Sequence, residues 1–168
     1  MEGSFHRVIL AQLIYRNSMS DSKERNVKNI FVQGPIDPTF IGKSISKHST
    51  KTNIGAHNIF LGQIRRDQIA GKSVEGIEYT AYEDMALEKM LEIREDIFGK
   101  YELTCMHVYH SLGLVAAGEI CLFVFCSSVR RKASIAACEE LVERIKAELP
   151  IWGKEIFEGE GHQWKQNT

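Results

Sequence analysis

The fold of this chain is decided by residues 120–150, which read ICLFVFCSSVRRKASIAACEELVERIKAELP. The first part, Ile120 to Ser128, is almost entirely apolar, which is typical of a central strand covered on both faces. The second part, Arg130 to Leu149, has apolar residues at helical spacing and stops at Pro150, so we expect one long helix. The apolar stripe of this helix consists of Ile135, Cys138, Leu141, Val142, Ile145 and Leu149.

Upstream of this stretch, the sequence predicts two further helices and several strands. A second long helix is expected at Glu83–Tyr101, because apolar residues repeat at helical spacing and acidic residues crowd its first turn. A short helix over Phe40, Ile41 and Ile45 is expected to begin at Asp37-Pro38, an N-cap followed by a proline at the first helical position. The expected strands and helices do not follow a strict βαβ order along the chain, which indicates an α+β fold. The stripe of the second helix is Ala86, Met90, Ile93 and Ile97, supported by Met85 and Phe98. The other expected strands cover residues 29–33, 55–64, 74–82, 103–110 and 154–157, and residues 65–72 read as a loop. Within 74–82 the odd-numbered positions are the more apolar.

Length and composition indicate one globular domain, which we expect to cover residues 28–168. Residues 1–27 read as an N-terminal extension, either flexible or a non-native start, with a short docked helix as the alternative. The formal charge is -1, from 21 basic and 22 acidic residues, which argues against a nucleic-acid coat. No apolar run approaches the roughly 20 residues that span a bilayer, so we expect no membrane partner.

Neither the cysteines nor the histidines predict a metal centre. The cysteines are single, with no C-x-x-C pair, so we expect small buried hydrophobes in a reducing, cytoplasmic compartment. The closest histidines, His107 and His110, lie three residues apart on an expected strand and therefore on opposite faces. No glycine-rich phosphate motif occurs, and we expect no cofactor. The four cysteines are Cys105, Cys121, Cys126 and Cys138.

Basic residues gather where the expected elements end. Arg65-Arg66 follow a strand, and Arg130 to Lys132 stand at the start of the last helix. Cations at a helix start oppose the macrodipole, so this cluster reads either as a bound-anion site or as a solvated turn. Lys146, near the end of the same helix, reads either as a favourable partner of the dipole or as a partly desolvated amine.

Five ordered motifs carry a family resemblance that runs from about Asn29 to Trp164. They are residues 55–65 (GAHNIFLGQIR), 77–82 (IEYTAY), 110–119 (HSLG through GE), 127–131 (SSVRR) and 145–155 (IK through PIWGKE). Together these motifs resemble the MoaE family, the large catalytic subunits of molybdopterin synthase.

The resemblance implies an α/β-hammerhead fold with a mostly antiparallel sheet, two long helices and one short helix. It also implies a homodimer flanked by two small ubiquitin-like sulfur carriers, forming a heterotetramer. In the implied reaction, two sulfurs pass from the carrier's C-terminal Gly-Gly thiocarboxylate into cyclic pyranopterin monophosphate. The product is the dithiolene of molybdopterin, and the sulfur comes from the partner, so no nucleophilic cysteine is needed in this chain.

The resemblance also assigns roles to nine residues. The catalytic residues that the resemblance implies are Lys146 and Lys154. Two positions depart from the family pattern: Arg130 stands where histidine is common, and Gly153 where a second lysine is common. Lys154, one position later, is the expected replacement. The substrate-binding residues would be Gln63, Ile64, Arg65, Arg130, Arg131, Gly153 and Glu155.

Helix geometry adds an expectation about the dimer. Arg131 and Lys146 lie fifteen residues apart on one expected helix, which separates their Cα atoms by about 22 Å at ~1.5 Å per residue. One subunit would not close both around a small substrate, so we expect the two residues to meet across a two-fold interface. The alternative function is a scaffold that binds the carrier or the pterin without turnover.

Overall fold

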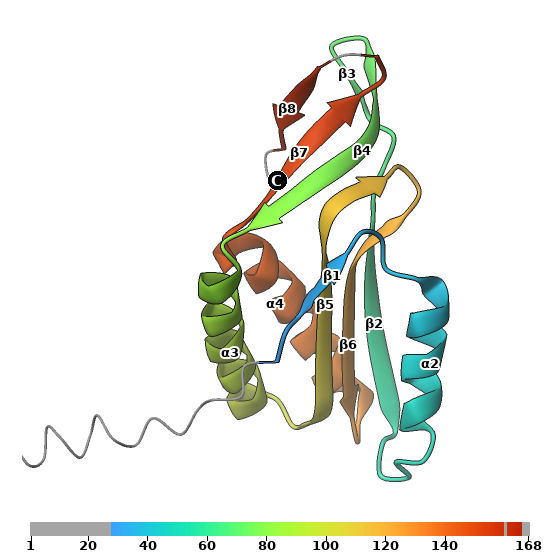
Figure 1. The fold of residues 1–168 in the computed structure, drawn as a ribbon. Helices are drawn as coiled ribbons and strands as arrows, with labels where there is room; N and C mark the ends of the chain where they lie inside the picture. Colours follow the sequence, from blue (N-terminus) through green and yellow to red (C-terminus); the bar gives the residue numbers. More distant parts are fainter. Residues whose placement is uncertain (1–27, 160, 166–168) are drawn as a thin grey trace, which may run out of the picture.

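A computed structural model describes residues 28–159 and 161–165, so the predicted extension over residues 1–27 lies outside the described residues. Figure 1 shows a body, in which a sheet lies between helices, and a narrower lobe of strands that projects from one end of it. The helices are α2 (Pro38–His48), α3 (Glu83–Lys100) and α4 (Arg131–Glu148). The strands are β1 (Phe31–Gln33), β2 (Ala56–Gln63), β3 (Gln68–Ile69), β4 (Lys72–Ala81), β5 (Leu103–Ala116), β6 (Ile120–Ser128), β7 (Ile151–Phe157) and β8 (His162–Trp164).

The strands form one sheet in the order β2-β6-β5-β4-β7-β8, and every neighbouring pair in this order is antiparallel. β1 adds to β5 in parallel. β5 joins the two parts of the molecule, because residues 103–110 pair with β6 and residues 113–116 pair with β4. Gly113, the first residue of the second segment, has φ 75°, a left-handed conformation that suits glycine. The strand is therefore longer than the expected 103–110, because Gly113 redirects the chain and does not end the strand.

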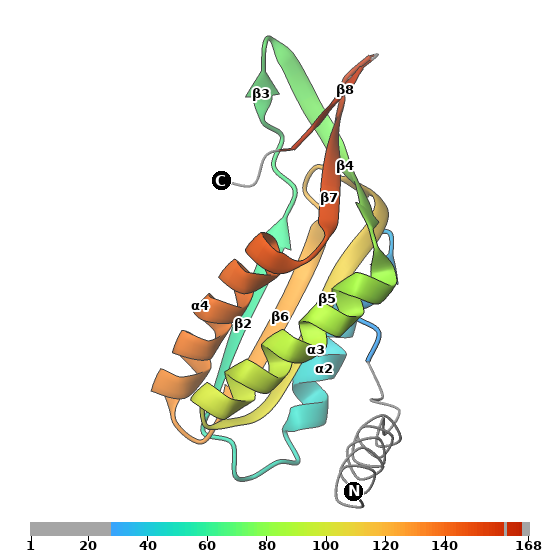
Figure 2. The ribbon, with the colours of Figure 1, turned by 90° about the vertical axis from the view of Figure 1, so that its left-hand side faces the viewer.

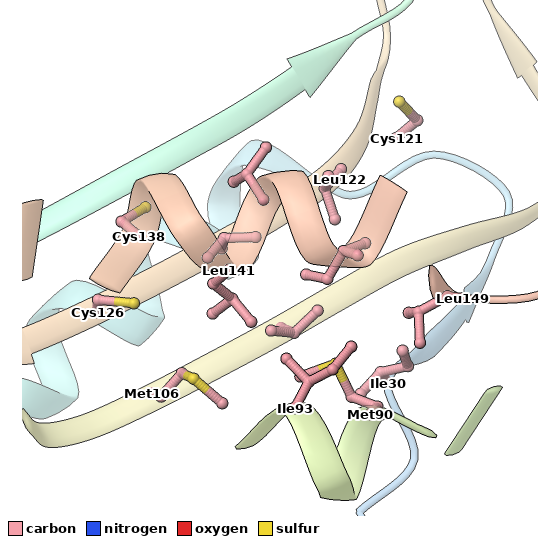
Figure 3. Packing of buried hydrophobic residues seen from close by; sticks show 14 of the residues in the cluster. Ile30, Met90, Ile93, Met106, Cys121, Leu122, Cys126, Cys138, Leu141 and Leu149 are labelled. Carbon is pink, nitrogen blue, oxygen red and sulfur yellow. The ribbon is translucent and has the colours of Figure 1, made fainter. Parts of the chain in front are cut away.

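Helices cover both faces of the body, with α3 and α4 on one face and α2 on the other (Figure 2). The larger core lies beneath α3 and α4, where Ile93 and Leu141 pack with residues of β5 and β6 (Figure 3). A smaller core beneath α2 contains Phe123 and Phe125 of β6. β6 has the predicted bounds and contributes to both cores, so the prediction of a central strand covered on both faces is confirmed.

The helical stripes are confirmed apart from one residue in each long helix. Ala86, Met90, Ile93 and Ile97 are all buried on α3, but Met85 is exposed, because consecutive residues lie about 100° apart around a helix and Met85 falls outside the stripe. On α4 the prediction was wrong for Ile135, which is half exposed at the edge of the stripe. The predicted cap of α2 is present, since Asp37 Oδ1 accepts a hydrogen bond from the Thr39 N–H at 2.7 Å. The residues that α4 buries are Ser134, Ala137, Cys138, Leu141, Val142 and Ile145.

The lobe departs from the predictions in two places. Residues 65–72, expected to be a loop, contain β3 and a tight turn in which Ala70 and Gly71 both have positive φ, which matches the twist of a hairpin. Along β4, the expected alternation fails at Val74, which is buried although it occupies an even position. The pairing of β4 with β7 shifts register between Val74 and Gly76, and this shift reverses the faces of the strand there.

All four cysteines are free thiols, and Cys121, Cys126 and Cys138 are buried as predicted. Cys105 differs, because it is only half buried on the face that α2 covers. Among the helices of the described residues, none has the length and apolar character needed to cross a bilayer.

Candidate active site

A pocket of about 410 Å³ lies where the lobe meets the body, beside the last turns of α4. We call it the α4 pocket. It brings together six of the nine predicted site residues, from three elements that are far apart in the sequence. They are Gln63, Ile64 and Arg65 at the end of β2, Lys146 on α4, and Gly153 and Glu155 on β7.

The segment after β2 is fixed to the turn between β5 and β6. The Ile64 N–H donates to the Glu119 carbonyl at 3.0 Å, and the Ile64 carbonyl accepts from the Gly118 N–H at 2.8 Å. Ile64 is buried, which holds Arg65 at the pocket wall with an exposed side chain. Arg65 pairs with Asp67 at 3.2 Å, and an exposed pair of this kind contributes only about 0–1 kcal/mol. The guanidinium is therefore available to a bound anion.

Lys146 and a buried histidine form the inner part of the pocket. Lys146 lies in the last turn of α4, where the macrodipole favours a cation. His110 lies on β5, and burial lowers the pKa of its imidazole, with a further contribution from the Lys146 ammonium. The Nδ1–H of His110 donates to the Ser111 carbonyl at 2.8 Å, because a carbonyl oxygen can only accept. The imidazole is consequently neutral at pH 7, and Lys146 lies beside it.

A buried carboxylate ties the end of the chain to the pocket. Glu155 is only 4% exposed, and it accepts hydrogen bonds from Gln163 Nε2 at 2.7 Å and Lys165 Nζ at 3.1 Å. The Lys165 N–H also donates to the Gly153 carbonyl at 2.8 Å. Buried charges require such partners. This arrangement places a second lysine, Lys165, in the pocket wall.

Lys154 does not line the pocket. It lies between two pocket residues on β7, so its side chain leaves the opposite face of the strand and pairs there with Glu78. Gly153 does face the pocket, but a Cβ there would meet Ile77 Cγ2 at 2.8 Å and Tyr79 Cε1 at 3.2 Å. The side chains of β4 thus occupy the space that a lysine at position 153 would need.

Cys121 lies in the pocket wall, but its environment keeps the thiol protonated. Burial raises the pKa of Cys121. The thiol donates to the Gly62 carbonyl at 3.4 Å and accepts from the Tyr79 hydroxyl at 3.5 Å. Because the thiolate is the reactive form of cysteine, this group is a poor nucleophile.

Arg130 and Arg131 are not brought to the pocket of the same chain. α4 runs without interruption from Arg131 to Glu148, so the arginines lie at its far end, with about 22 Å between the Cα atoms of Arg131 and Lys146. Both arginines are exposed, and Arg130 occupies the N-cap without a side-chain capping bond. Within one described chain, the predicted site cations therefore lie in two separate places, with Arg130 and Arg131 at one end of α4 and Lys146 at the other.

Two titratable residues of the pocket, His110 and Lys165, were given no site role from the sequence. His110 begins one of the family motifs and was weighed as a metal ligand, but the motif does not show which cavity the side chain borders. Lys165 belongs to a segment that reads as a polar tail. The one available signal was Trp164 beside it, a large residue that indicates some order in that tail.

Comparison with known proteins identifies the family of this chain. A family model described as "MoaE protein" matches residues 32–148. This chain belongs to the MoaE family. Among curated members, a molybdopterin synthase catalytic subunit from Dictyostelium discoideum is 34% identical over 149 residues, covering 87% of this chain and 91% of that protein. One from Drosophila pseudoobscura pseudoobscura is 37% identical over 136 residues, covering 80% of this chain. The chain spans only about a third (36%) of the length of that Drosophila relative.

Solved MoaE-type structures share the fold. The crystal structure of molybdopterin synthase from Staphylococcus aureus has a TM-score of 0.72 and 31% identity, covering 83% of this chain and 98% of that one. A complex of subunits 1 and 2 of molybdopterin-converting factor from Helicobacter pylori has a TM-score of 0.70 at 20% identity, covering 82% and 89%. The second likeness concerns the fold alone. The α+β class is therefore confirmed, with three helices and a mostly antiparallel sheet in the described residues.

Proposed function

We propose that this chain is the catalytic subunit of a molybdopterin synthase, which transfers sulfur from a thiocarboxylated ubiquitin-like carrier to cyclic pyranopterin monophosphate. The observation that carries the proposal is the α4 pocket, where six residues of the family pattern converge in a chain of the MoaE family. Relatives named molybdopterin synthase catalytic subunit support the same reading. We also propose a cytoplasmic location, because the thiols are free and lack the spacing of a disulfide framework.

The charges of the pocket suit this substrate and this sulfur donor. Arg65, Lys146 and Lys165 supply three cations to the lining, and the carboxylates of Asp67 and Glu155 offset two of them. The cyclic phosphate and the thiocarboxylate tail are both anions, which guanidinium and ammonium groups bind through charge-assisted hydrogen bonds. Arg65, exposed at the end of β2, is suited to the phosphate.

Lys146 is the residue best placed to act in the chemical step. Its ammonium lies beside the neutral His110 in the inner pocket, where a fixed cation stabilises negative charge that develops as sulfur is transferred. The same ammonium can give a proton to a departing group. Cys121 is a protonated thiol, so we assign the sulfur to the carrier and no covalent step to this chain.

We propose that Lys165 takes the position of the second lysine that Gly153 lacks. The family pattern has a lysine where this chain has Gly153, and Lys165 reaches the same wall from the end of β8, with its N–H bonded to the Gly153 carbonyl. Glu155 holds the Lys165 ammonium at 3.1 Å. The role that the sequence suggested for Lys154 thus passes to Lys165 in this proposal.

We further propose a homodimer in which each active site is shared. Arg130 and Arg131 of one subunit would complete the pocket that contains Lys146 of the other, because one continuous α4 keeps them about 22 Å apart within a chain. Mixed dimers of Arg131→Ala and Lys146→Ala test this. In each mixed dimer one of the two sites has both residues intact, so activity should return. Mixed dimers that form but stay inactive would contradict the shared site.

Reconstitution tests the function itself. The full chain is combined with a thiocarboxylated carrier and cyclic pyranopterin monophosphate, and molybdopterin is measured. Product is expected only with the thiocarboxylate, and a carrier that ends in a plain carboxylate is the control. Binding of both carrier and pterin without product would favour the alternative, a non-catalytic scaffold.

A further inference from the structure

On the face of the sheet opposite the α4 pocket, three metal-ligating side chains converge beneath α2. They are His48 at the end of α2 and Cys105 and His107 on β5, and their ligand atoms all lie within 4.8 Å of one another. We propose that these three residues, the α2-face cluster, form a binding site for a divalent cation of the zinc class. No metal site was expected from the sequence, because His107 was compared only with His110.

Rigid elements hold the cluster. Cys105 and His107 alternate on β5, so both project from the same face of a strand that is paired with β6. The rings of His48 and His107 lie against Phe125 of β6, at centroid distances of 4.8 and 6.0 Å. Ligands on paired strands and a helix end keep a more precise geometry than ligands on loops.

Hydrogen bonds fix the ring nitrogen that His48 presents. Its Nδ1–H donates to the Ser44 carbonyl at 2.7 Å, so Nε2 keeps its lone pair. A backbone carbonyl on the far nitrogen is the usual support of a metal-bound histidine. The Nε2 atoms of His48 and His107 lie 3.2 Å apart. Two nitrogens bound tetrahedrally at about 2.0–2.1 Å are separated by about 3.3 Å, so the two rings already have the required spacing.

Hydrogen bonds define which ring nitrogen carries the proton at each histidine of the cluster. In the unliganded cluster, Lys28 donates to His107 Nδ1 at 3.4 Å, and the His107 Nε2–H donates to His48.

Cation binding changes these protons in a balanced way. The Cys105 thiol releases one proton to solvent and binds as thiolate, while the His107 proton moves from Nε2 to Nδ1 and displaces Lys28. Two imidazoles and one thiolate are a ligand set typical of zinc, and water takes the fourth position. The bound ion would join the end of α2 to β5 and so stabilise the packing of this helix. The inference does not depend on the proposed sulfur transfer.

Cobalt(II) is a spectroscopic probe of this site. The full chain, stripped of metal and kept reduced, is titrated with Co²⁺ alone. One equivalent should give a thiolate-to-cobalt charge-transfer band and the visible bands of tetrahedral cobalt, and Zn²⁺ should displace both. Cys105→Ser should abolish the charge-transfer band, and His107→Gln should weaken binding at least tenfold. Cys121→Ser, a thiol on the other face, is the matched control and should leave the spectrum unchanged.

Two further measurements keep the test decisive. Thermal unfolding without metal verifies that each variant folds, and Zn²⁺ should raise the Tm of the parent chain and of Cys121→Ser but not of Cys105→Ser. If the parent chain binds neither ion, or if the Cys105→Ser variant binds both ions as tightly as the parent chain does, the cluster is only a hydrogen-bonded histidine pair. That outcome would overturn the proposal.

Discussion

His107 and His110 lie three positions apart on β5, and they serve opposite faces of the sheet. His110 borders a pocket of charged groups, with Lys146 nearby and the buried Glu155 in the same wall. His107 borders aromatic rings, a second imidazole and a thiol beneath α2. Burial lowers the pKa of both histidines, yet one faces a site suited to anions and the other a site suited to a cation. The neighbouring elements decide the chemistry of each face, and the strand itself only separates them.

Removing the cation of the pocket face should have the largest effect. We expect Lys146→Ala to abolish molybdopterin formation, because the inner pocket loses the charge that stabilises developing negative charge. Stability should fall little, since a cation at a helix C-terminus contributes about 0.3–1 kcal/mol. Turnover and Tm are measured together, and Lys43→Ala, an exposed lysine on α2 that does not line the pocket, is the control. Activity retained by a folded Lys146→Ala would remove Lys146 from the mechanism.

The next effect separates the two faces of β7. Lys165→Ala should lower turnover about a hundredfold or more, because one positioned proton-transfer or charge-stabilising group typically contributes about 10²–10⁴-fold. Lys154→Ala should change it by less than twofold, because that ammonium pairs with Glu78 outside the pocket. The two variants are matched, since each removes one lysine paired with a carboxylate. Lys165→Arg should restore part of the activity. Equal losses at the two positions would contradict the assignment of Lys165.

A smaller effect concerns stability at mildly acidic pH. Because the pKa of buried His110 is lowered, the unfolded chain takes up a proton below about pH 6.5 that the folded chain refuses. Stability is therefore full above that pH and decreases as the pH falls toward the folded pKa. Tm is measured at pH 7.5 and 5.5 for the parent chain, His110→Gln and the exposed His162→Gln. The difference in Tm between the two pH values should be smaller than in the parent chain only for His110→Gln. An unchanged difference in Tm would count against the lowered pKa.

The smallest effect is expected at the thiol of the pocket. Cys121→Ser should keep sulfur transfer from a pre-thiocarboxylated carrier within about twofold, because burial holds this thiol protonated and the carrier brings the sulfur. The Tm should decrease, since a hydroxyl replaces a buried thiol. A folded Cys121→Ser without activity would show that this face of the sheet supplies a nucleophile after all.

Local patterns predicted the centre of the fold well. β6 has the expected bounds because its apolar run is uninterrupted, and α4 ends where Pro150 requires it to end. The residues of the pocket from β2, α4 and β7 followed from the family resemblance. The sequence did not indicate the continuation of β5 past Gly113, because a glycine in a strand reads as a break unless the positive φ is known.

Other features depend on contacts between distant parts of the chain. Lys165 could not be assigned because its position depends on Glu155 and on the pairing of β7 with β8. The α2-face cluster joins His48 to Cys105 and His107, which lie 57 and 59 positions later. No motif with a fixed spacing relates residues so far apart in the sequence. Lys154 was expected at the site because it directly follows Gly153 in the sequence, but the pairing of β7 places its side chain on the other face of the strand.

The pairing of β4 with β7 also has a consequence for how the chain folds. Ala81 pairs with Ile151 and Val74 with Phe157, so the two walls of the pocket meet only across long stretches of sequence. Closing long loops slows folding, whereas β5 and β6 are joined by a short turn and can pair early. During synthesis, the body has its strands available before β7 is made. We therefore expect the pocket to form last, and a chain that stops before residue 151 would have a sheet but lack the β7 wall of the pocket.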